Sequence, residues 1–212
     1  MRDNQAAAEQ SGFYLGIFEG HSDPAVAIVK DGKIIAYAEE ERHLRYKHAT
    51  GLYPERALQY CLDYAGITLE QLSGVGINWA MDSYSDGTMA AFYDTVNEEY
   101  DVDQKTKSWQ NGMCSRFNRD NLTRIHHFNW RKMYGDVDFP PLLGFGHHYV
   151  HAFHAALQSP FEQSLCITLD GSGDEHCTVV WKHDGTSVTP IKEVKVPHSL
   201  GWLYAGITEY LG

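Results

Sequence analysis

Short apolar runs separated by polar residues dominate the start of the chain, and this pattern is typical of β-strands. The pair Asp31-Gly32 lies between two of these runs. An Asp-Gly pair flanked by apolar residues is a strong signal for a tight hairpin turn. The sequence therefore predicts three successive strands, at Phe13–Phe18, Ala25–Lys30 and Lys33–Ala38.

The hydrophobic spacing then changes to that of an amphipathic helix. Between Pro54 and Ala65 the apolar positions recur at helical intervals, and they are Ala57, Leu58, Cys61, Leu62 and Ala65. Proline is favoured at the start of a helix and glycine just after its end, which fits Pro54 and Gly66. A buried strand at Val75–Trp79 follows. This order of elements predicts an α/β sheet rather than an all-β domain.

Regular patterns return in the last third of the chain. A helix is predicted at His147–Gln158, because Ser159-Pro160 disfavours its continuation. Asp170–Gly173 is predicted to form a turn, since it places two glycines after an apolar run. The other predicted elements are strands at Leu142–Phe145 and Ser164–Leu169, a hairpin of Thr178–Lys182 and Ser187–Val196 around Asp184-Gly185, and a capped helix from Ser199.

Residues 82–135 have a different composition, rich in Tyr, Asn, Asp and Trp and with weak periodicity. We interpret them as a mostly helical insertion that is weakly ordered in part, with helices near Thr88–Glu99 and Asn118–Tyr134. Their aromatic side chains can line a substrate pocket or pack the insertion onto the domain. The sequence leaves both alternatives open.

Charge and composition exclude some classes of protein. The formal net charge of −11 argues against a general nucleic-acid binder, which normally carries a basic surface. No apolar run approaches the length of a membrane span, and residues 1–12 are expected to form a flexible polar lead-in without a secretory signal. The four cysteines are scattered and form no CxxC pair. We therefore expect a cytoplasmic protein with reduced thiols, bound neither to membrane nor to nucleic acid.

The first candidate for chemistry is the segment from His147 to His151. On a helix, side chains four residues apart lie on one face, so His147 and His151 have the spacing of two ligands to one metal ion. His154 lies roughly on the same face. The alternative is a set of solvated or capping histidines.

Three other segments carry reactive residues. A carboxylate followed by glycines after a buried strand, as at Asp170–Gly173, often binds a metal or phosphate, although it is also a common hairpin turn. His21 in a loop can transfer a proton or be an ordinary surface residue. The charged segment Glu39–His48 can bind phosphate through Arg and Lys or form a solvated face.

Taken in order, these segments resemble the O-carbamoyltransferases of antibiotic biosynthesis and nodulation. Four blocks carry the resemblance: Leu15–His48 with Gly20-His21 and Glu39-Glu40-Glu41-Arg42, His147–Ala152 with Ser159-Pro160-Phe161, Asp170-Gly171-x-Gly173-x-Glu175, and Ser199-Leu200-Gly201 with Tyr210-Leu211-Gly212. The match covers residues 13–212 except the insertion. It departs from the family at Ser22, which stands between the histidine and the aspartate of the first block.

The resemblance implies an actin/sugar-kinase-like (ribonuclease H-like) fold, related to the enzyme that adds threonylcarbamoyl groups to tRNA. Residues 13–212 would be the first lobe of the N-terminal domain and would be incomplete at the C-terminus. The second lobe and an adenylate-forming domain would be absent from this chain, so the fragment would be inactive alone. We expect a homodimer as one option for its assembly.

The resemblance also implies the activity and its residues. Such an enzyme moves a carbamoyl group from carbamoyl-adenylate, made from carbamoyl phosphate and ATP, to a hydroxyl of a small-molecule or sugar acceptor. His147, His151 and Asp170 would bind a divalent metal, expected to be iron. Asp170 and the segment Gly171, Ser172 and Gly173 would face the nucleotide. His21 and Lys47 would lie at the reacting carbamoyl group.

Two other functions remain alternatives at this point. An actin-like ATPase or sugar kinase shares the fold but has no need of two histidines at helical spacing. A non-catalytic metal- or nucleotide-binding module would function with a separate partner chain. Metal analysis and thermal-shift measurements with ATP, AMP and carbamoyl phosphate would distinguish the three.

Overall fold

The computed structural model describes residues 12–19 and 22–212. The chain forms two compact units, each made of two stretches of sequence: Met1–Ile77 with Thr123–Leu143, and Asn78–Leu122 with Gly144–Gly212. We call them unit 1 and unit 2. The predicted flexible lead-in lies almost entirely outside the described residues, as does His21. The assignment of residues 13–212 to one lobe of a larger domain stays a prediction.

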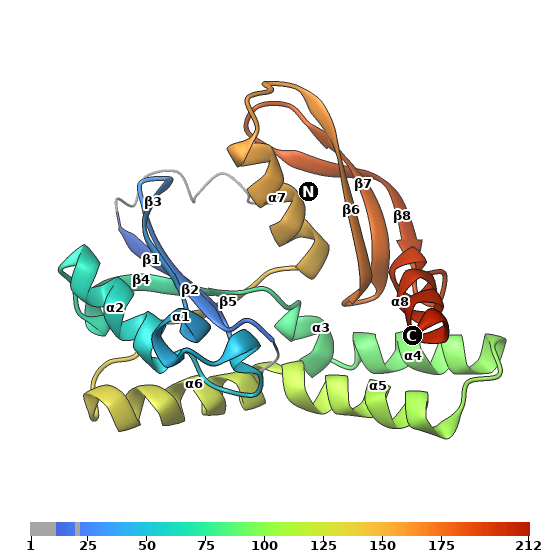
Figure 1. Cartoon of the computed structure of the whole chain (residues 1–212), viewed down its shortest axis with the longest axis horizontal. Helices are drawn as coiled ribbons and strands as arrows, with labels where there is room; N and C mark the ends of the chain where they lie inside the picture. Colours follow the sequence, from blue (N-terminus) through green and yellow to red (C-terminus); the bar gives the residue numbers. More distant parts are fainter. Residues whose placement is uncertain (1–11, 20–21) are drawn as a thin grey trace. The chain divides into compact units, whose positions relative to one another are not determined.

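A five-stranded sheet in the order β3-β2-β1-β4-β5 forms the centre of unit 1 (Figure 1). Its strands are β1 Phe13–Phe18, β2 Ala25–Lys30, β3 Lys33–Glu39, β4 Leu72–Ile77 and β5 Leu142–Gly144. The first three are antiparallel neighbours, and β4 runs parallel to β1. The predicted α/β fold with a mixed sheet and flanking helices is confirmed.

Apolar side chains of β2 and helix α2 (Glu55–Ala65) form much of the core of unit 1. Val26 and Ile28 are fully buried, as are Leu58 and Cys61 of α2. The helix begins after Pro54 and ends at Gly66, as predicted. The strand predicted at Val75–Trp79 lies at Leu72–Ile77 instead, because a capped turn at Thr68–Gln71 brings the chain into the sheet earlier.

A buried carboxylate binds the beginning of α2. Glu40 is 2% exposed, and its Oε2 accepts the Ala57 N–H at 2.7 Å while its Oε1 accepts the Arg56 N–H at 3.3 Å. Since Pro54, the residue before the helix, provides no side-chain cap, Glu40 takes that role from a distant position. The short elements around it are α1 Glu40–Leu44, η1 Lys47–Ala49 and η2 Leu69–Gln71.

The predicted insertion is mostly helical, as expected. Its helices are α3 Met81–Ser85, α4 Thr88–Glu99, α5 Gln104–Phe117 and α6 Arg119–Tyr134. Helices α4 and α6 were predicted, whereas α3 and α5 were not. Helix α5 buries only Gln110 and Phe117, so its sequence lacks the apolar stripe that would have revealed it. The boundary between the two units falls within α6, after Leu122.

Unit 2 contains a three-stranded antiparallel sheet, β6-β7-β8. The strands are β6 Ser164–Gly173, β7 His176–His183 and β8 Val188–Lys195, and the helices beside them are α7 His147–Gln158 and α8 Leu200–Leu211. Helix α7 packs on one face of the sheet through Ala152 and Ala156, against Val179 and Trp181 (Figure 1). Ser199 caps α8 by accepting the Trp202 N–H, which confirms the predicted capped helix.

The turn predicted at Asp170–Gly173 is wrong. Strand β6 continues through these residues to Gly173, and the chain turns at Asp174-Glu175 instead. The pairing of β6 with β7 shifts register between Leu169 and Gly173. The two glycines therefore mark an irregularity inside the strand, the other situation in which glycine is common in a sheet.

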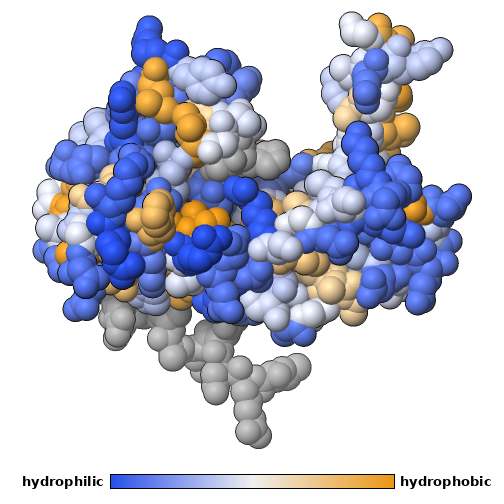
Figure 2. Space-filling view, turned by 90° about the horizontal axis from the view of Figure 1, so that it is seen from below, coloured by the Kyte–Doolittle hydropathy of each residue, from blue (hydrophilic) through white to orange (hydrophobic). Residues whose placement is uncertain are grey.

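Polar residues cover most of the molecular face in Figure 2, and apolar residues form only small groups there. This agrees with the acidic composition of the chain. Within the part of the chain that the structure describes, no helix is both long enough and apolar enough to cross a bilayer.

Candidate metal centre

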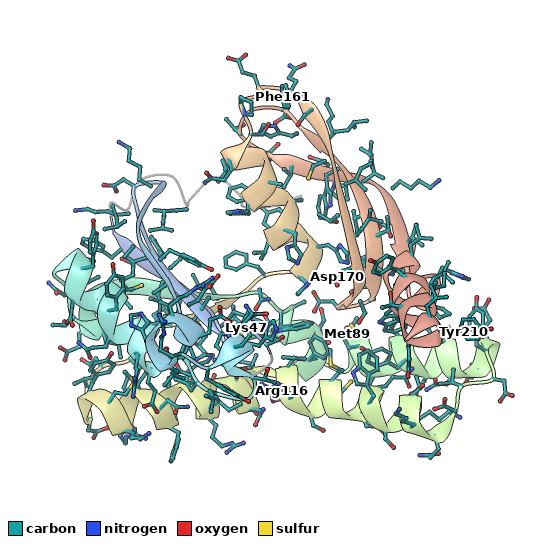
Figure 3. All side chains as sticks on the ribbon, viewed as in Figure 1. Lys47, Met89, Arg116, Phe161, Asp170 and Tyr210 are labelled. Carbon is teal, nitrogen blue, oxygen red and sulfur yellow. The ribbon has the colours of Figure 1, made fainter. Side chains whose placement is uncertain are left out.

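Helix α7 and strand β6 bring three ligand-type side chains together in unit 2. His147 and His151 lie one turn apart at the start of α7. Asp170, labelled in Figure 3, lies on β6, and its carboxylate is close to both imidazole rings. His147 Nε2 is 3.0 Å from Asp170 Oδ2 and 3.0 Å from His151 Nε2. His151 Nε2 lies 3.7 Å from the same carboxylate oxygen. The predicted ligand residues therefore converge.

These three atoms fit a divalent cation. Ligand atoms that share one ion at about 2.0–2.2 Å lie roughly 3–4 Å from one another. Two imidazoles and a carboxylate are a common donor set for zinc, iron and related metals. Asp170 Oδ1 accepts the Gly171 N–H at 2.7 Å, which leaves Oδ2 facing the histidines. Hydrogen bonds to His147 and, with a smaller effect, to His151 hold the pKa of Asp170 well below its ordinary value, so the carboxylate is ionised.

The ring of His147 is enclosed by neighbouring groups. A Cβ on Gly173 would overlap His147 Cδ2, so only glycine leaves room for the ring at that position. Trp79 lies against the imidazole with a centroid separation of 4.8 Å. The side chain of His147 is 12% exposed, whereas that of His151 is 56% exposed. Of the two predicted ligands, His147 is therefore the enclosed one and His151 the accessible one.

A buried carboxylate that the sequence analysis did not single out holds the backbone of His147. Asp174 Oδ2 accepts the His147 N–H at 2.8 Å, and Oδ1 accepts the Ala80 N–H at 3.2 Å. Asp174 is 5% exposed, and burial raises the pKa of its carboxyl group. An acidic residue directly after two glycines was the available signal, but its partners depend on tertiary structure.

His148, the buried residue that follows His147, anchors another side of α7. Its Nε2 lies 3.2 Å from the His176 carbonyl oxygen, and its Nδ1 lies 2.8 Å from Thr168 Oγ1. Burial lowers the pKa of His148 to about 4, so the ring is neutral near pH 7. A carbonyl can only accept, so Nε2 carries the proton and Nδ1 accepts from the Thr168 hydroxyl. His148 thus anchors the helix, and the preceding residue, His147, belongs to the ligand cluster.

Gly171, Ser172 and Gly173 were predicted to face nucleotide phosphates. A Cβ on Gly171 would lie 2.7 Å from Trp202 Nε1, so the indole of α8 packs against this glycine. The space beside Gly173 is taken by His147. Close packing therefore accounts for both glycines in this structure, and their role toward a nucleotide stays a prediction.

Of the two predicted catalytic residues, Lys47 belongs to unit 1. His21 lies outside the described residues. Lys47 Nζ lies 3.1 Å and 3.2 Å from the two carboxylate oxygens of Glu41, which is buried. The pKa of Glu41 is lowered most by the hydrogen bond from the backbone N–H of His48 and next by the hydrogen bond from the Lys47 side chain. The partnership of His21 and Lys47 with the ligand cluster stays a prediction.

A second group of ligand-type atoms, which the sequence did not indicate, lies in unit 1. It consists of Asp23, Glu41 and His48, whose ligand atoms are within 4.8 Å of one another. His48 Nδ1 is 2.9 Å from Asp23 Oδ1. Glu41 is already paired with Lys47, and both His48 and Asp23 are about half exposed. Existing ion pairs therefore account for this group.

Comparison with known proteins shows the family of the chain. Residues 14–212 match the family described as "Carbamoyltransferase N-terminus". The uncharacterized protein sll1178 of Synechocystis is 32% identical over 93% of this chain, and nodulation protein NolNO of Sinorhizobium fredii is 33% identical over 90%. The chain spans only 32% and 25% of those two proteins. YeaZ from Pseudomonas aeruginosa has a TM-score of 0.44 at 13% identity, covering 92% of this chain and 79% of that one.

Proposed function

Because the chain belongs to the carbamoyltransferase family, as its N-terminal region, we propose that it takes part in moving a carbamoyl group to a hydroxyl of a small-molecule or sugar acceptor. The observation that carries this proposal is the convergence of His147, His151 and Asp170. An actin-like ATPase or sugar kinase has no need of such a set.

We propose that His147, His151 and Asp170 bind one divalent metal ion, with iron as the expected metal. A bound ion at this place would supply positive charge to oxygen atoms that become negative during the reaction. The ionised Asp170 carboxylate contributes the charge that favours a cation over a neutral ligand. The enclosed His147 keeps its Nε2 directed at the carboxylate.

The proposed carbamoyl donor is carbamoyl-adenylate, made from carbamoyl phosphate and ATP in another part of the full-length protein. The acceptor hydroxyl oxygen forms a bond to the carbamoyl carbon, and the bond from that carbon to the phosphate oxygen breaks, so AMP leaves. His21 takes the proton of the acceptor hydroxyl. Lys47 stabilises negative charge on the carbamoyl oxygen or the leaving phosphate. Asp170 and the segment Gly171–Gly173 face the nucleotide.

In this scheme the ammonium group of Lys47 must be able to reach the donor phosphate or the carbamoyl oxygen. Its ammonium group is paired with Glu41, and its side chain is 71% exposed. The exposed position lets the ammonium group reach a phosphate without being buried. A Lys47→Ala substitution is expected to slow transfer but to leave the metal content unchanged, because Lys47 is not one of the proposed metal ligands.

The test uses a full-length protein that contains this region. The wild type and an Asp170→Asn variant are compared for metal content by mass spectrometry and for acceptor-dependent release of AMP from carbamoyl phosphate and ATP. Asp94→Asn, an exposed aspartate on α4, is the matched control. We expect the control to behave as wild type and Asp170→Asn to lose both metal and transfer. Wild-type protein that transfers carbamoyl groups after complete removal of metal would contradict the proposal.

A further inference from the structure

Asp174 occupies a special position in the turn between β6 and β7. Its φ of 54° lies in the left-handed region, which an aspartate adopts at some cost and a glycine adopts freely. It is also buried, although a carboxylate is costly to bury without partners. Its two oxygens accept N–H groups from two separate elements, at Ala80 and at His147. These two bonds account for its burial.

The bond to His147 replaces a missing helix cap. Gly146 precedes α7 and has no side chain to cap it, so the first N–H groups of the helix need an acceptor from elsewhere. Asp174 provides that acceptor and places negative charge at the positive end of the helix dipole. The residue whose N–H it accepts is His147, the enclosed member of the ligand cluster.

The same hairpin carries the third ligand. Asp170 and Asp174 both belong to the end of β6 and its turn, so the carboxylate of Asp174 ties the backbone of His147 to the strand that holds Asp170. Gly173, between them, lies directly against the His147 ring. Two contacts of His147 therefore fix the distance from its Nε2 to Asp170 Oδ2. Its ring packs against Gly173, and its backbone N–H donates to Asp174.

We propose that Asp174 is a positioning residue for the metal site: it fixes His147 opposite Asp170 and thereby raises the affinity for the metal, without binding the ion itself. This inference rests on the metal site of the proposed function. A carboxylate that only stabilised the fold would affect unfolding but not the metal affinity of the folded protein.

The test measures the Zn²⁺ dissociation constant of the folded, metal-free chain by competition with a chromophoric chelator. Asp174→Asn keeps the size of the side chain but turns an NH₂ group toward a backbone donor. Asp174→Gly removes the carboxylate and suits the left-handed turn, so it retains the fold if the first variant does not. Groups that orient metal ligands typically change affinity by about 10- to 100-fold, and we expect Zn²⁺ binding to weaken within that range.

Glu40→Gln is the matched control, because Glu40 is a buried carboxylate that accepts N–H groups at the start of a helix carrying no ligand. We expect this variant to unfold more easily but to bind Zn²⁺ as tightly as the wild type. Unchanged Zn²⁺ affinity in either folded Asp174 variant would overturn the inference. A wild-type chain that binds no Zn²⁺, Co²⁺ or Fe²⁺ would instead refute the metal site of the proposed function.

Discussion

Helices α2 and α7 begin in the same way but serve different purposes. Each follows a residue that provides no side-chain cap, and a buried carboxylate from elsewhere in its own unit accepts two N–H groups in the first turn of α2 and one in that of α7. Glu40 does this for α2 and Asp174 for α7. The inner face of α2 is apolar and fully buried, whereas α7 begins with an imidazole that faces another carboxylate.

The difference shows what a helix cap can do beyond stabilising a helix. At α2 a small displacement would affect only packing, because the capped residues Arg56 and Ala57 have no chemical role. At α7 the capped residue is itself a proposed ligand, so the same displacement would separate His147 from Asp170. On the proposed metal site, a hydrogen bond of ordinary strength would then control the geometry of the ligands.

The largest expected effect is a loss of metal affinity when a proposed ligand on α7 is removed. We expect His151→Ala to weaken metal binding by at least about 100-fold, beyond the range typical of groups that only orient ligands. His154→Ala changes an exposed histidine of the same helix that is not in the cluster, and its metal affinity should stay near wild type. Isothermal titration with Zn²⁺ measures both. Equal losses in the two variants would mean that the ligand set is wrong.

Leucine-to-alanine substitutions on the two helices compare their packing. Leu58 on α2 is fully buried, and its truncation should cost about 2–5 kcal/mol of unfolding free energy. Leu157 on α7 is 55% exposed, so the same change should cost less than about 0.5 kcal/mol. Urea denaturation followed by circular dichroism gives both values. A costly Leu157→Ala would show that α7 is covered by a further surface in solution.

Acid should weaken unit 1 through a buried histidine on α6. Burial lowers the pKa of His126 to about 3, and its Nδ1 is 2.8 Å from the Tyr53 hydroxyl. Between the unfolded pKa of about 6.5 and the folded value, only the unfolded chain binds the proton, so stability falls as the pH falls through that window. The slope should approach about 1.4 kcal/mol per pH unit.

His126→Gln should flatten this dependence between about pH 6 and pH 4, because glutamine does not titrate. The measurement is the urea midpoint at several pH values. Its control is His183→Gln, a buried histidine on β7 of unit 2. A wild-type chain whose stability stays constant over this range would contradict the neutral buried state of His126.

The smallest expected effect concerns the cap of α2. Glu40→Gln leaves one buried N–H facing an amide, and losing one good partner typically costs about 1–3 kcal/mol. Thermal unfolding of the metal-free chain measures it. Glu39→Gln is the control, since Glu39 bonds only exposed groups, Tyr37 and Arg42. If both variants unfold alike, the carboxylate of Glu40 has no special part in holding α2.

Local signals predicted much of the structure. The three antiparallel strands of unit 1, helix α7 and the pairing of its two histidines followed from periodicity, turn residues and spacing, whereas the family resemblance added Asp170 to that pair. These features depend on residues near one another in sequence, or on a carboxylate that follows an apolar run. The predicted His147–Gln158 helix has the same bounds in the structure.

Features that depend on distant contacts could not be predicted. The glycines of Asp170–Gly173 indicate a turn by composition, yet they lie in a strand because His147 and Trp202 pack against them. Asp174 has no motif of its own, and its role appears only when Ala80 and His147 reach it. Helix α5 was missed because its buried positions are few and one of them is the polar Gln110.

The contact between Trp79 and His147 has a spectroscopic consequence. Trp79 is 8% exposed, and its indole lies beside the imidazole of a ligand. The emission of an indole depends on the charge and electronic state of the ring next to it, so this tryptophan should brighten or dim as the ligand cluster gains or loses an ion. If the cluster binds an ion as proposed, Trp79 should report its occupancy, and a Trp79→Phe variant should show a smaller fluorescence change than the wild type in a Zn²⁺ titration.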